Sequence, residues 1–329
     1  MNLKSFFRLS VFFSVLLLSQ GCIHEYPKGG GNDPNKIDLG LELNFNLNWE
    51  SMIHQVEWST RARTERPNRF IIEMMRNNNI IGRDTLYLTD EEYVTGKYQH
   101  KLSFPVGANY YNLVAWYDRF EEGGVNPVFN TDNLTAVSLN HTGIENVEIT
   151  RSAFGSENID LSEYRGKKGV AVTKEVNFRH PGARFVIETE DYQEFLLNQK
   201  EALNQGDSFR IKINFDKDGP ALLNLYSDKI DYDFGLPSRE GKLNLPFIPD
   251  ENLEIAEGFL FCSEEDYITM SIIVYNSALL QVARTDNFTF PVKRGFITRI
   301  KGDFLTAPIN SSIKIDHIWE GEIIVEVEV

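Results

Sequence analysis

Apolar and polar residues alternate along much of this chain, and this pattern predicts strands. In residues 39–50, every odd-numbered position from Leu39 to Trp49 is apolar, whereas the even-numbered positions carry glycine, asparagine or glutamate. A period of two places one face of a strand on a core and the other in water. Many short strands separated by turn residues indicate an all-β protein of the β-sandwich type. The same alternation predicts further strands at residues 102–106, 209–215, 268–274, 288–292 and 325–329.

Two segments depart from this simple alternation. Residues 110–117 (YYNLVAWY) are apolar on both faces, which predicts a central strand. We expect Trp116 in this segment, and Trp49, to fill the core of the first half. The stretch from Asp191 to Leu203 predicts a helix, because acidic residues come early and a lysine comes late, and Gly206 follows as a stop. This helix is expected to lie against the edge or end of a sheet.

The N-terminus has the features of a bacterial lipoprotein signal peptide. A lysine and an arginine precede an apolar stretch at residues 9–19, and Cys22 follows a glycine. This stretch is too short to span a hydrocarbon core of about 30 Å, so residues 1–21 are predicted to be a signal and not an anchor helix. Acyl chains on Cys22, palmitate among them, would hold the chain at a membrane. Ser19 stands where such signals usually have leucine, so an ordinary secretory signal is the alternative.

The remaining chain is long enough for two domains. Cleavage before Cys22 leaves 308 residues, which is long for one core. Residues 22–36 are rich in glycine, proline and asparagine and predict a flexible tether. The periodicity lapses and the charge density rises over residues 158–168. We therefore expect an N-terminal sandwich at residues 37–160 and a C-terminal sandwich at residues 161–329.

Charge and cysteine content exclude some classes of protein. Without the signal, the chain has 31 basic residues against 48 acidic ones, a formal charge of −17. Such a surface repels nucleic acid, so no nucleic-acid partner is expected. If Cys22 carries lipid, Cys262 has no partner in the chain, which excludes an internal disulfide and a cysteine-based metal site. We expect Cys262 to be a small buried side chain.

The sequence contains no catalytic motif with a recognised spacing. It lacks His-Glu-x-x-His, Gly-x-Ser-x-Gly and a phosphate-binding glycine loop, and its six histidines are scattered. Asp228, Asp231 and Asp233 form an acidic cluster that is either a calcium site or a solvated turn, and its spacing matches no standard calcium loop. We therefore expect no enzymatic activity, no cofactor and no metal site. Two close carboxylates with perturbed pKa values in a concave pocket would instead indicate an enzyme.

Three motifs, taken in order, resemble one known family. Residues 104–107 read FPVG, residues 178–184 read FRHPGAR, and residues 290–306 read FPVKRGFITRIKGDFLT. Together with the lipoprotein signal and the first strand, they are similar to the fimbrillin-related lipoproteins of Bacteroidota, which include fimbrial stalk, tip and anchor subunits. The resemblance implies two tandem transthyretin-like β-sandwich domains. It also implies an outer-membrane lipoprotein, facing the cell surface or the periplasm, that acts with other fimbrial subunits in adhesion or pilus assembly.

Two glycines in these motifs have predicted backbone roles. Gly107 is expected to adopt a positive φ at the entry to the central strand, because only glycine does so without a steric penalty. Arg294-Gly295 is expected to form a tight turn between strands at residues 287–292 and 297–304. These residues specify the fold and not a chemical reaction.

The resemblance also marks residues that are candidates for modification. Asp84-Thr85-Leu86 resembles the three-residue O-glycosylation motif of exported Bacteroidota proteins, with Thr85 as the acceptor. In polymerising relatives, a protease cuts after an arginine that follows the first strand, and Arg61 and Arg63 follow the first strand here. The alternative interpretation of these arginines is an exposed, charged hairpin loop.

A stand-alone surface adhesin or glycan-binding lipoprotein is the alternative to a fimbrial accessory subunit. Sugar rings stack on flat side chains, so an exposed cluster of Tyr110, Tyr111, Tyr117 and Phe120 would favour it. A subunit that donates a strand to its neighbour needs one beyond those of its own sandwich. Residues 322–329 are predicted to close the second sandwich, with their odd-numbered positions facing its core. We therefore expect no repeating stalk role.

Overall fold

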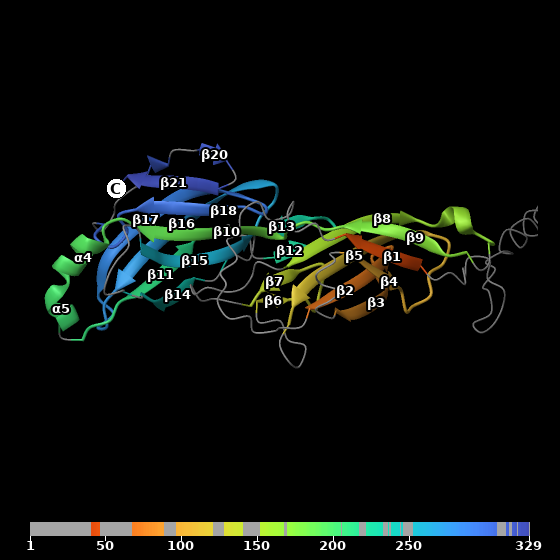
Figure 1. The fold of residues 1–329 in the computed structure, drawn as a ribbon, viewed down its shortest axis with the longest axis horizontal. Coiled ribbons are helices and arrows are strands. Elements are labelled where there is room, and N and C mark those ends of the chain that lie inside the picture. Colours follow the sequence, from red (N-terminus) through yellow and green to blue (C-terminus); the bar gives the residue numbers. More distant parts are fainter. Residues whose placement is uncertain are drawn as a thin grey trace, which may run out of the picture.

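The structure, a computed structural model, is all-β and sandwich-like apart from short helical segments, as the sequence predicted. Its two halves lie end to end along the long axis of the molecule (Figure 1). Trp49, Cys22, Arg61 and Arg63 lie outside the described residues, so the predictions at these positions stay predictions. The structure describes residues 41–46, 68–88, 97–120, 128–140, 152–167, 170–204, 206–216, 222–232, 236, 238–243, 245, 253–307, 314–315, 318–320 and 322–328.

Two sheets form the N-terminal half. Their facing side chains make one buried core, in which the rings of Phe45 and Phe70 stack with centroids 4.7 Å apart. A short 3-10 helix, η2 (Ser162–Tyr164), follows the last strand of the first sheet. That sheet has the order β3-β2-β5-β8, with β2 at Asn68–Arg76, β3 at Asn79–Leu88, β5 at Tyr110–Arg119 and β8 at Ala153–Asp160. The other has the order β4-β1-β9, with β1 at Leu41–Asn46, β4 at Lys97–Lys101 and β9 at Val172–Asn177.

Strand β9 pairs with the N-terminal half although it follows the expected boundary at residues 160/161. It runs parallel to β1, from Val172 opposite Leu41 to Asn177 opposite Asn46. Its buried residues join the core of the N-terminal sandwich. We therefore propose that the boundary between the two domains lies near Phe178, directly after β9.

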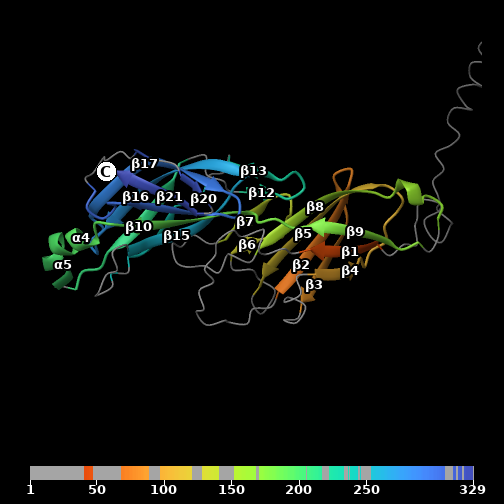
Figure 2. The ribbon, with the colours of Figure 1, turned by 45° about the horizontal axis from the view of Figure 1, so that its top comes forward.

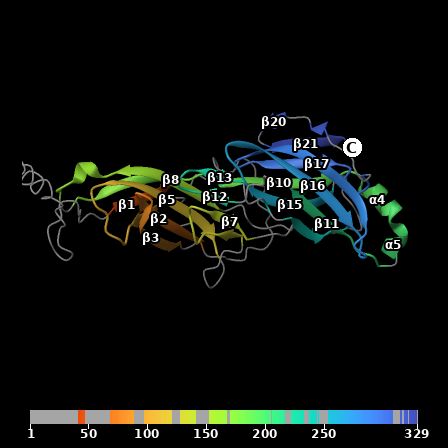
Figure 3. The same cartoon turned by 180° about the vertical axis from the view of Figure 1, so that it is seen from behind.

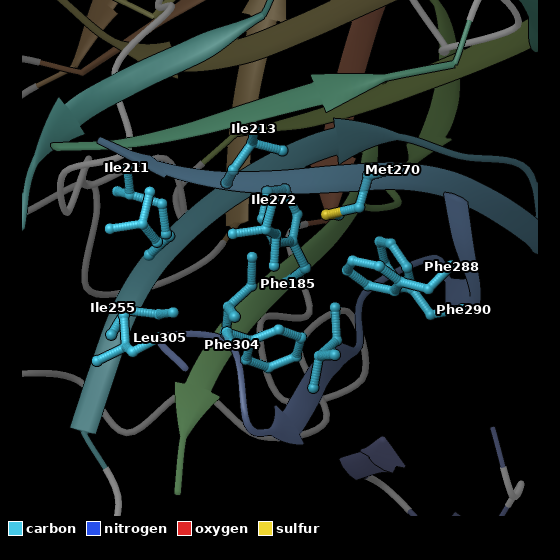
Figure 4. Close-up of a cluster of buried hydrophobic side chains, with 14 of the residues drawn as sticks. Phe185, Ile211, Ile213, Ile255, Met270, Ile272, Phe288, Phe290, Phe304 and Leu305 are labelled. Carbon is cyan, nitrogen blue, oxygen red and sulfur yellow. The ribbon is translucent and has the colours of Figure 1, made fainter. Parts of the chain in front are cut away.

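Two larger sheets form the C-terminal half. Figure 4 shows their apolar side chains meeting in one core, with Phe185 from the first sheet and Ile272 from the second. Cys262 is buried in this core, as predicted. The first sheet has the order β15-β10-β18-β21-β19, and its strands are β10 (Gly182–Thr189), β15 (Leu253–Phe261), β18 (Ile297–Gly302), β19 (Lys314–Ile315) and β21 (Glu322–Glu328), with β20 (Ile318–Glu320) also paired to β21. The second has the order β14-β11-β16-β17, with β11 at Arg210–Phe215, β14 at Arg239–Lys242, β16 at Glu265–Tyr275 and β17 at Gln281–Lys293.

A small sheet joins the two halves. Strands β7 and β12 pair across the junction, with Val137 opposite Leu223. Figures 2 and 3 show this sheet between the two sandwiches from two further directions. Its order is β13-β12-β7-β6, with β6 (Phe129–Asn130) and β7 (Val137–Leu139) from the N-terminal half and β12 (Leu222–Asn224) and β13 (Lys229–Asp231) from the C-terminal half.

The predicted helix forms two shorter ones at the end of the C-terminal half that lies away from the junction (Figure 1). They are α4 (Tyr192–Asn198) and α5 (Lys200–Asn204), separated at Gln199. Gly206 has φ +81° and stops the chain from continuing as a helix, as predicted. Tyr192 and Phe195 are buried, which fixes α4 to the end of the sandwich.

Most of the predicted strand faces are confirmed, and one predicted strand is wrong. Leu41, Leu43 and Phe45 are all buried on one face of β1. Residues 102–106 form no strand, although Leu102 and Val106 are buried. Pro105 has no N–H for a ladder, and the N–H of Ser103 donates to the Asp84 carboxylate at 2.8 Å. The apolar-polar alternation at residues 102–106 therefore reflects side-chain burial in an irregular loop and not a strand.

The two glycine predictions have different outcomes. Gly295 has φ +77° and forms the expected turn between β17 and β18. Gly107 does not have a positive φ; among the described glycines only Gly166, Gly206 and Gly295 do. The hydroxyl of Tyr111 instead donates to the Gly107 carbonyl at 3.0 Å. Gly107 is therefore held by a side chain and not by a left-handed backbone.

Strand β5 is central, as predicted, and its two faces belong to different cores. Leu113, Ala115 and Tyr117 face the core of the N-terminal sandwich. Val114 and Trp116 lie in a separate cluster toward the C-terminal half. From Leu113 to Tyr117 the run is apolar on both faces because neither face meets water, whereas Tyr110 and Asn112 at its start are exposed.

The C-terminal strand is part of the second sandwich, as predicted. β21 runs parallel to β18, with Val325 opposite Ile300, and pairs with β19 and β20 on its other side. The direction in which its side chains point stays a prediction.

Candidate functional site

The junction between the two sandwiches has an apolar core of its own. Trp116 packs edge to face on Phe129, with ring centroids 5.0 Å apart. Phe129 in turn contacts Phe259 and Phe261 of β15, at centroid distances of 5.7 and 6.0 Å. All four side chains are buried. Because both halves contribute to one cluster, separating them would expose apolar surface to water.

A carboxylate between two arginines lies beside this core, and we call Asp228, Arg179, Arg294 and Phe154 the clasp. The guanidinium of Arg294 donates to both oxygens of Asp228, at 3.0 and 2.9 Å. Nη2 of Arg179 lies 3.1 Å from Oδ2 of the same carboxylate. The Arg179 guanidinium also covers the Phe154 ring at 4.3 Å. Phe154 lies on β8 and Asp228 between β12 and β13, so the clasp connects the two halves.

The clasp changes the interpretation of the acidic cluster. The carboxylate of Asp228 faces two arginines, which is unfavourable for a cation, so the calcium alternative has no support at this residue. Asp233 lies outside the described residues. Within the described ranges, no three His, Cys, Asp or Glu side chains come together as a metal site.

A second polar contact crosses the junction. The hydroxyl of Tyr226, which follows β12, donates to Oε1 of Glu73 on β2 at 2.8 Å. Arg83 lies 3.3 Å from the other oxygen of Glu73 and also donates to the Thr131 carbonyl at 2.6 Å. Burial and the charge of Glu73 raise the pKa of Tyr226. The phenol therefore stays protonated and acts as a donor.

The segment that links the sandwiches is tightly packed. His180 is buried, and its Nδ1 lies 2.8 Å from the Gly182 carbonyl oxygen. Burial lowers the pKa of His180 to about 4, so the ring is neutral at pH 7 and Nδ1–H donates to the carbonyl. A Cβ at Gly182 would come within 1.9 Å of the Leu260 carbonyl oxygen, so only glycine fits. This contact holds Gly182 against β15 of its own sheet, whereas the backbone of Arg179 exchanges two hydrogen bonds of 2.9 Å with Phe154 on β8, so the FRHPGAR motif contacts both halves.

The sequence-predicted modification site at Thr85 is exposed. Thr85 lies on β3, which is an edge strand of its sheet among the described residues. The neighbouring Asp84 is buried and its carboxylate accepts hydrogen bonds from the loop that follows β4. Thr85 is therefore accessible to a modifying enzyme, and its glycosylation stays a prediction.

The exposed aromatic cluster that would favour the glycan-binding alternative does not form. Tyr111, Tyr117 and Phe120 are buried, and of the four residues only Tyr110 is exposed. The hydroxyl of Tyr117 donates to the side chain of Asn68 at 2.7 Å, which satisfies it inside the sandwich. Tyr111 and Tyr117 provide no stacking surface for a sugar, because their rings lie in the core of the N-terminal sandwich.

One group of residues has the composition of a catalytic triad but not its geometry. Nε2 of His100 lies 3.0 Å from Oδ2 of Asp84, and the hydroxyl of Ser103 also donates to Asp84. In a triad the serine would bond to the imidazole instead. Burial acts to raise the pKa of Asp84, but the hydrogen bonds from Ser103 and His100 lower it overall. The group fastens the loop after β4 to β3.

The junction was not predicted from the sequence, although its parts were noticed. Arg179 and Arg294 lie in two of the motifs, and Asp228 lies in the acidic cluster. The residues of the Arg294–Asp228 pair are 66 positions apart. Motif order alone does not show that they meet.

In the described part of the chain, no helix is long and apolar enough to cross a membrane.

The chain belongs to the Family of unknown function (DUF6562), whose model matches residues 34–328. No curated protein matches it. Among solved structures, it is similar to the fimbrial anchor protein Mfa2 from Porphyromonas gingivalis, with 10% identity and a TM-score of 0.42, covering 75% of this chain and 82% of that one. A candidate adhesin from Bacteroides ovatus has 13% identity and a TM-score of 0.40, covering 77% and 75%. A candidate cell adhesion protein from Bacteroides eggerthii has 9% identity and a TM-score of 0.41, covering 91% and 100%.

These solved structures are described as a fimbrial anchor protein and candidate adhesion proteins. Their similarity to this chain is too low to define a function. The sheets themselves define the fold.

Proposed function

We propose that this protein is a non-enzymatic, lipid-anchored protein of the cell envelope that acts as a fimbrial or fimbrillin-like accessory subunit in adhesion or pilus assembly. The observation that carries the proposal is the junction. A shared sheet, a shared apolar core and the clasp hold the two sandwiches in one orientation. A body held together in this way keeps its two ends in fixed relative positions and transmits force between them.

The arrangement of the chain gives the two ends of this body different roles. β1, the first described strand, belongs to the N-terminal sandwich, whereas α4 and α5 lie at the opposite end of the molecule (Figure 1). A lipid on Cys22 and a tether at residues 22–36 would attach the N-terminal half to the outer membrane. The far end of the C-terminal sandwich would then face away from the membrane, toward other subunits or a surface ligand.

The pairing of β21 supports an accessory role over a repeating stalk role. β21 has partners on both sides within its own sheet, β18 on one and β19 with β20 on the other. A strand that is already paired is not free to complete a neighbour's sandwich. This supports a subunit at the base or tip of an assembly, or one that acts alone.

Replacement of Cys22 by serine tests the proposal. We expect the Cys22→Ser protein to move from the membrane fraction to the soluble fraction. In a second experiment, protease added to intact cells should cleave the wild-type protein. Retention of the variant in the membrane would count against lipidation. Protection of the wild-type protein on intact cells would place it on the periplasmic side and argue against adhesion.

A further inference from the structure

The tip of the β16–β17 hairpin presents two leucines to solvent. Residues 276–280 connect Tyr275 to its partner Gln281. Leu279 is 66% exposed and Leu280 is 64% exposed. Turns of this kind usually carry glycine, asparagine, aspartate or serine. Two adjacent leucines at the end of a hairpin leave apolar surface in water, and covering that surface would be favourable.

Hydrogen bonds hold this tip in a defined conformation. The N–H of Leu279 donates to the Asn276 carbonyl at 2.9 Å, and the N–H of Leu280 donates to the Asn276 side chain at 2.8 Å. Leu279 has φ +59°, a region that bulky residues rarely adopt. Backbone strain of this kind persists where the surroundings enforce it and is concentrated at functional sites. The tip is thus built to point its side chains outward.

The tip lies beside the helices at the far end of the molecule. The N–H of Ser277 donates to Oδ1 of Asp207 at 3.1 Å, and Asp207 follows α5 closely. Leu197 on α4 is 73% exposed and adds a third apolar side chain to this end. Figures 1 and 3 show both helices at the extremity of the C-terminal half.

The helical segment beside the tip is acidic, and Arg210, which lies opposite Tyr275 at the base of the tip, is ion-paired with Glu240. Residues 190–208 contain five acidic residues and one basic residue. Glu194 and Glu201 are exposed, and burial together with the charges of Asp191 and Glu194 raises the pKa of Asp303. Anionic lipid would be repelled from this end, and so would a second copy of a chain whose formal charge is −15. The complementary partner is a protein with an apolar pocket bordered by basic residues.

We propose that the hairpin tip, with Leu279 and Leu280 at its centre, is a docking site that inserts into an apolar pocket bordered by lysine or arginine on a partner protein. Burial of the two leucines would supply affinity, and the acidic surroundings would set orientation and association rate. The inference rests on the proposed function in that it assumes a protein partner at the cell envelope.

Site-specific photocrosslinking of the full-length protein in intact cells tests the inference. A benzophenone amino acid replaces Leu279, Leu280 or, as a control, Tyr267, which is 59% exposed on the same hairpin. Tyr267 is nine residues from Asn276, roughly 30 Å along the strand. We expect one discrete protein adduct from positions 279 and 280, and at least about fivefold less from position 267. The crosslinked partner peptide should be apolar and flanked by lysine or arginine.

A binding measurement with that purified partner completes the test. Leu279→Gly suits the positive φ and Leu280→Ser removes the second side chain, so the double variant should melt no lower than wild type. Its Kd should rise about tenfold or more, while Tyr267→Ser should change it by less than about twofold.

Four results would overturn the inference: no adduct at 279 and 280, equal adducts at 267, adducts only to lipid, or adducts with the mass of two copies of this chain. Membrane fractionation of the same cells reports on anchoring independently. Loss of the adduct in a correctly anchored protein therefore refutes the docking site and not the proposed function.

Discussion

Replacement of Trp116 by alanine should both destabilise the protein and loosen its junction. The indole is completely buried, packs on Phe129 at 5.0 Å and donates from Nε1 to Oδ2 of Asp118 at 3.0 Å. Removing a buried indole costs about 3–5 kcal/mol, and the lost hydrogen bond adds about 1 kcal/mol. Because a typical domain has about 5–15 kcal/mol of stability, this is a large fraction. The melting temperature should fall by roughly 10–20 °C.

Calorimetry and urea unfolding of the Cys22→Ser protein, with and without the substitution, measure this effect. In the parent protein we expect a single unfolding transition, because the two sandwiches share a core. In Trp116→Ala we expect two transitions, since the coupling between the halves is weakened. Trp116→Phe is the matched control: it keeps an aromatic ring against Phe129, loses the N–H and should cost about 1–3 kcal/mol. A Trp116→Ala protein that melts within about 2 °C of its parent, in one transition, would refute the packing argument.

Three further predictions follow from the clasp, the linking segment and the last strand. Asp228→Asn should lower the free energy of unfolding in urea by about 1–3 kcal/mol, because two arginines lose their charged partner. As a control, Arg210→Gln at the exposed Arg210–Glu240 pair should lower it by less than about 1 kcal/mol. Equal losses of stability would contradict a special role for the clasp. Burial lowers the pKa of His180 to about 4, below its value of 6.5 in the unfolded chain. Because the unfolded chain then binds a proton more readily than the folded protein, the free energy of unfolding should fall by about 2 kcal/mol from pH 7 to pH 5. His180→Asn should lose this component, and an unchanged pH profile would show that another group is responsible. Deletion of residues 324–329 should give insoluble or poorly stable protein, as seen in soluble yield and melting; a deleted protein that stays folded but no longer binds a partner would show that β21 is a free donor strand.

The sequence by itself determined the properties that depend on neighbouring residues. The period of two in β1, β11 and β16 predicted which side chains would be buried, because adjacent residues of a strand point to opposite faces regardless of its partners. Gly206 and Gly295 were predicted as a helix stop and a turn, and both have positive φ. Local reasoning was wrong where burial did not imply a strand, as at residues 102–106, but right for the apolar run at residues 110–117, which was predicted to be a central strand. In that run, three of the four rings face cores.

Only the tertiary structure decided which of these local pieces meet. The parallel pairing of β1 with β9 joins segments about 130 residues apart, and no local pattern specifies it. The same holds for the clasp, whose two arginines lie on either side of Asp228 in sequence, and for Trp116, which was expected in the first core and lies in the junction. The alternating pattern shows that a face is covered but not by what, since any apolar surface satisfies the hydrophobic effect. The choice of partner is made by the topology of the whole chain, and in this protein that choice fixes two sandwiches into one body.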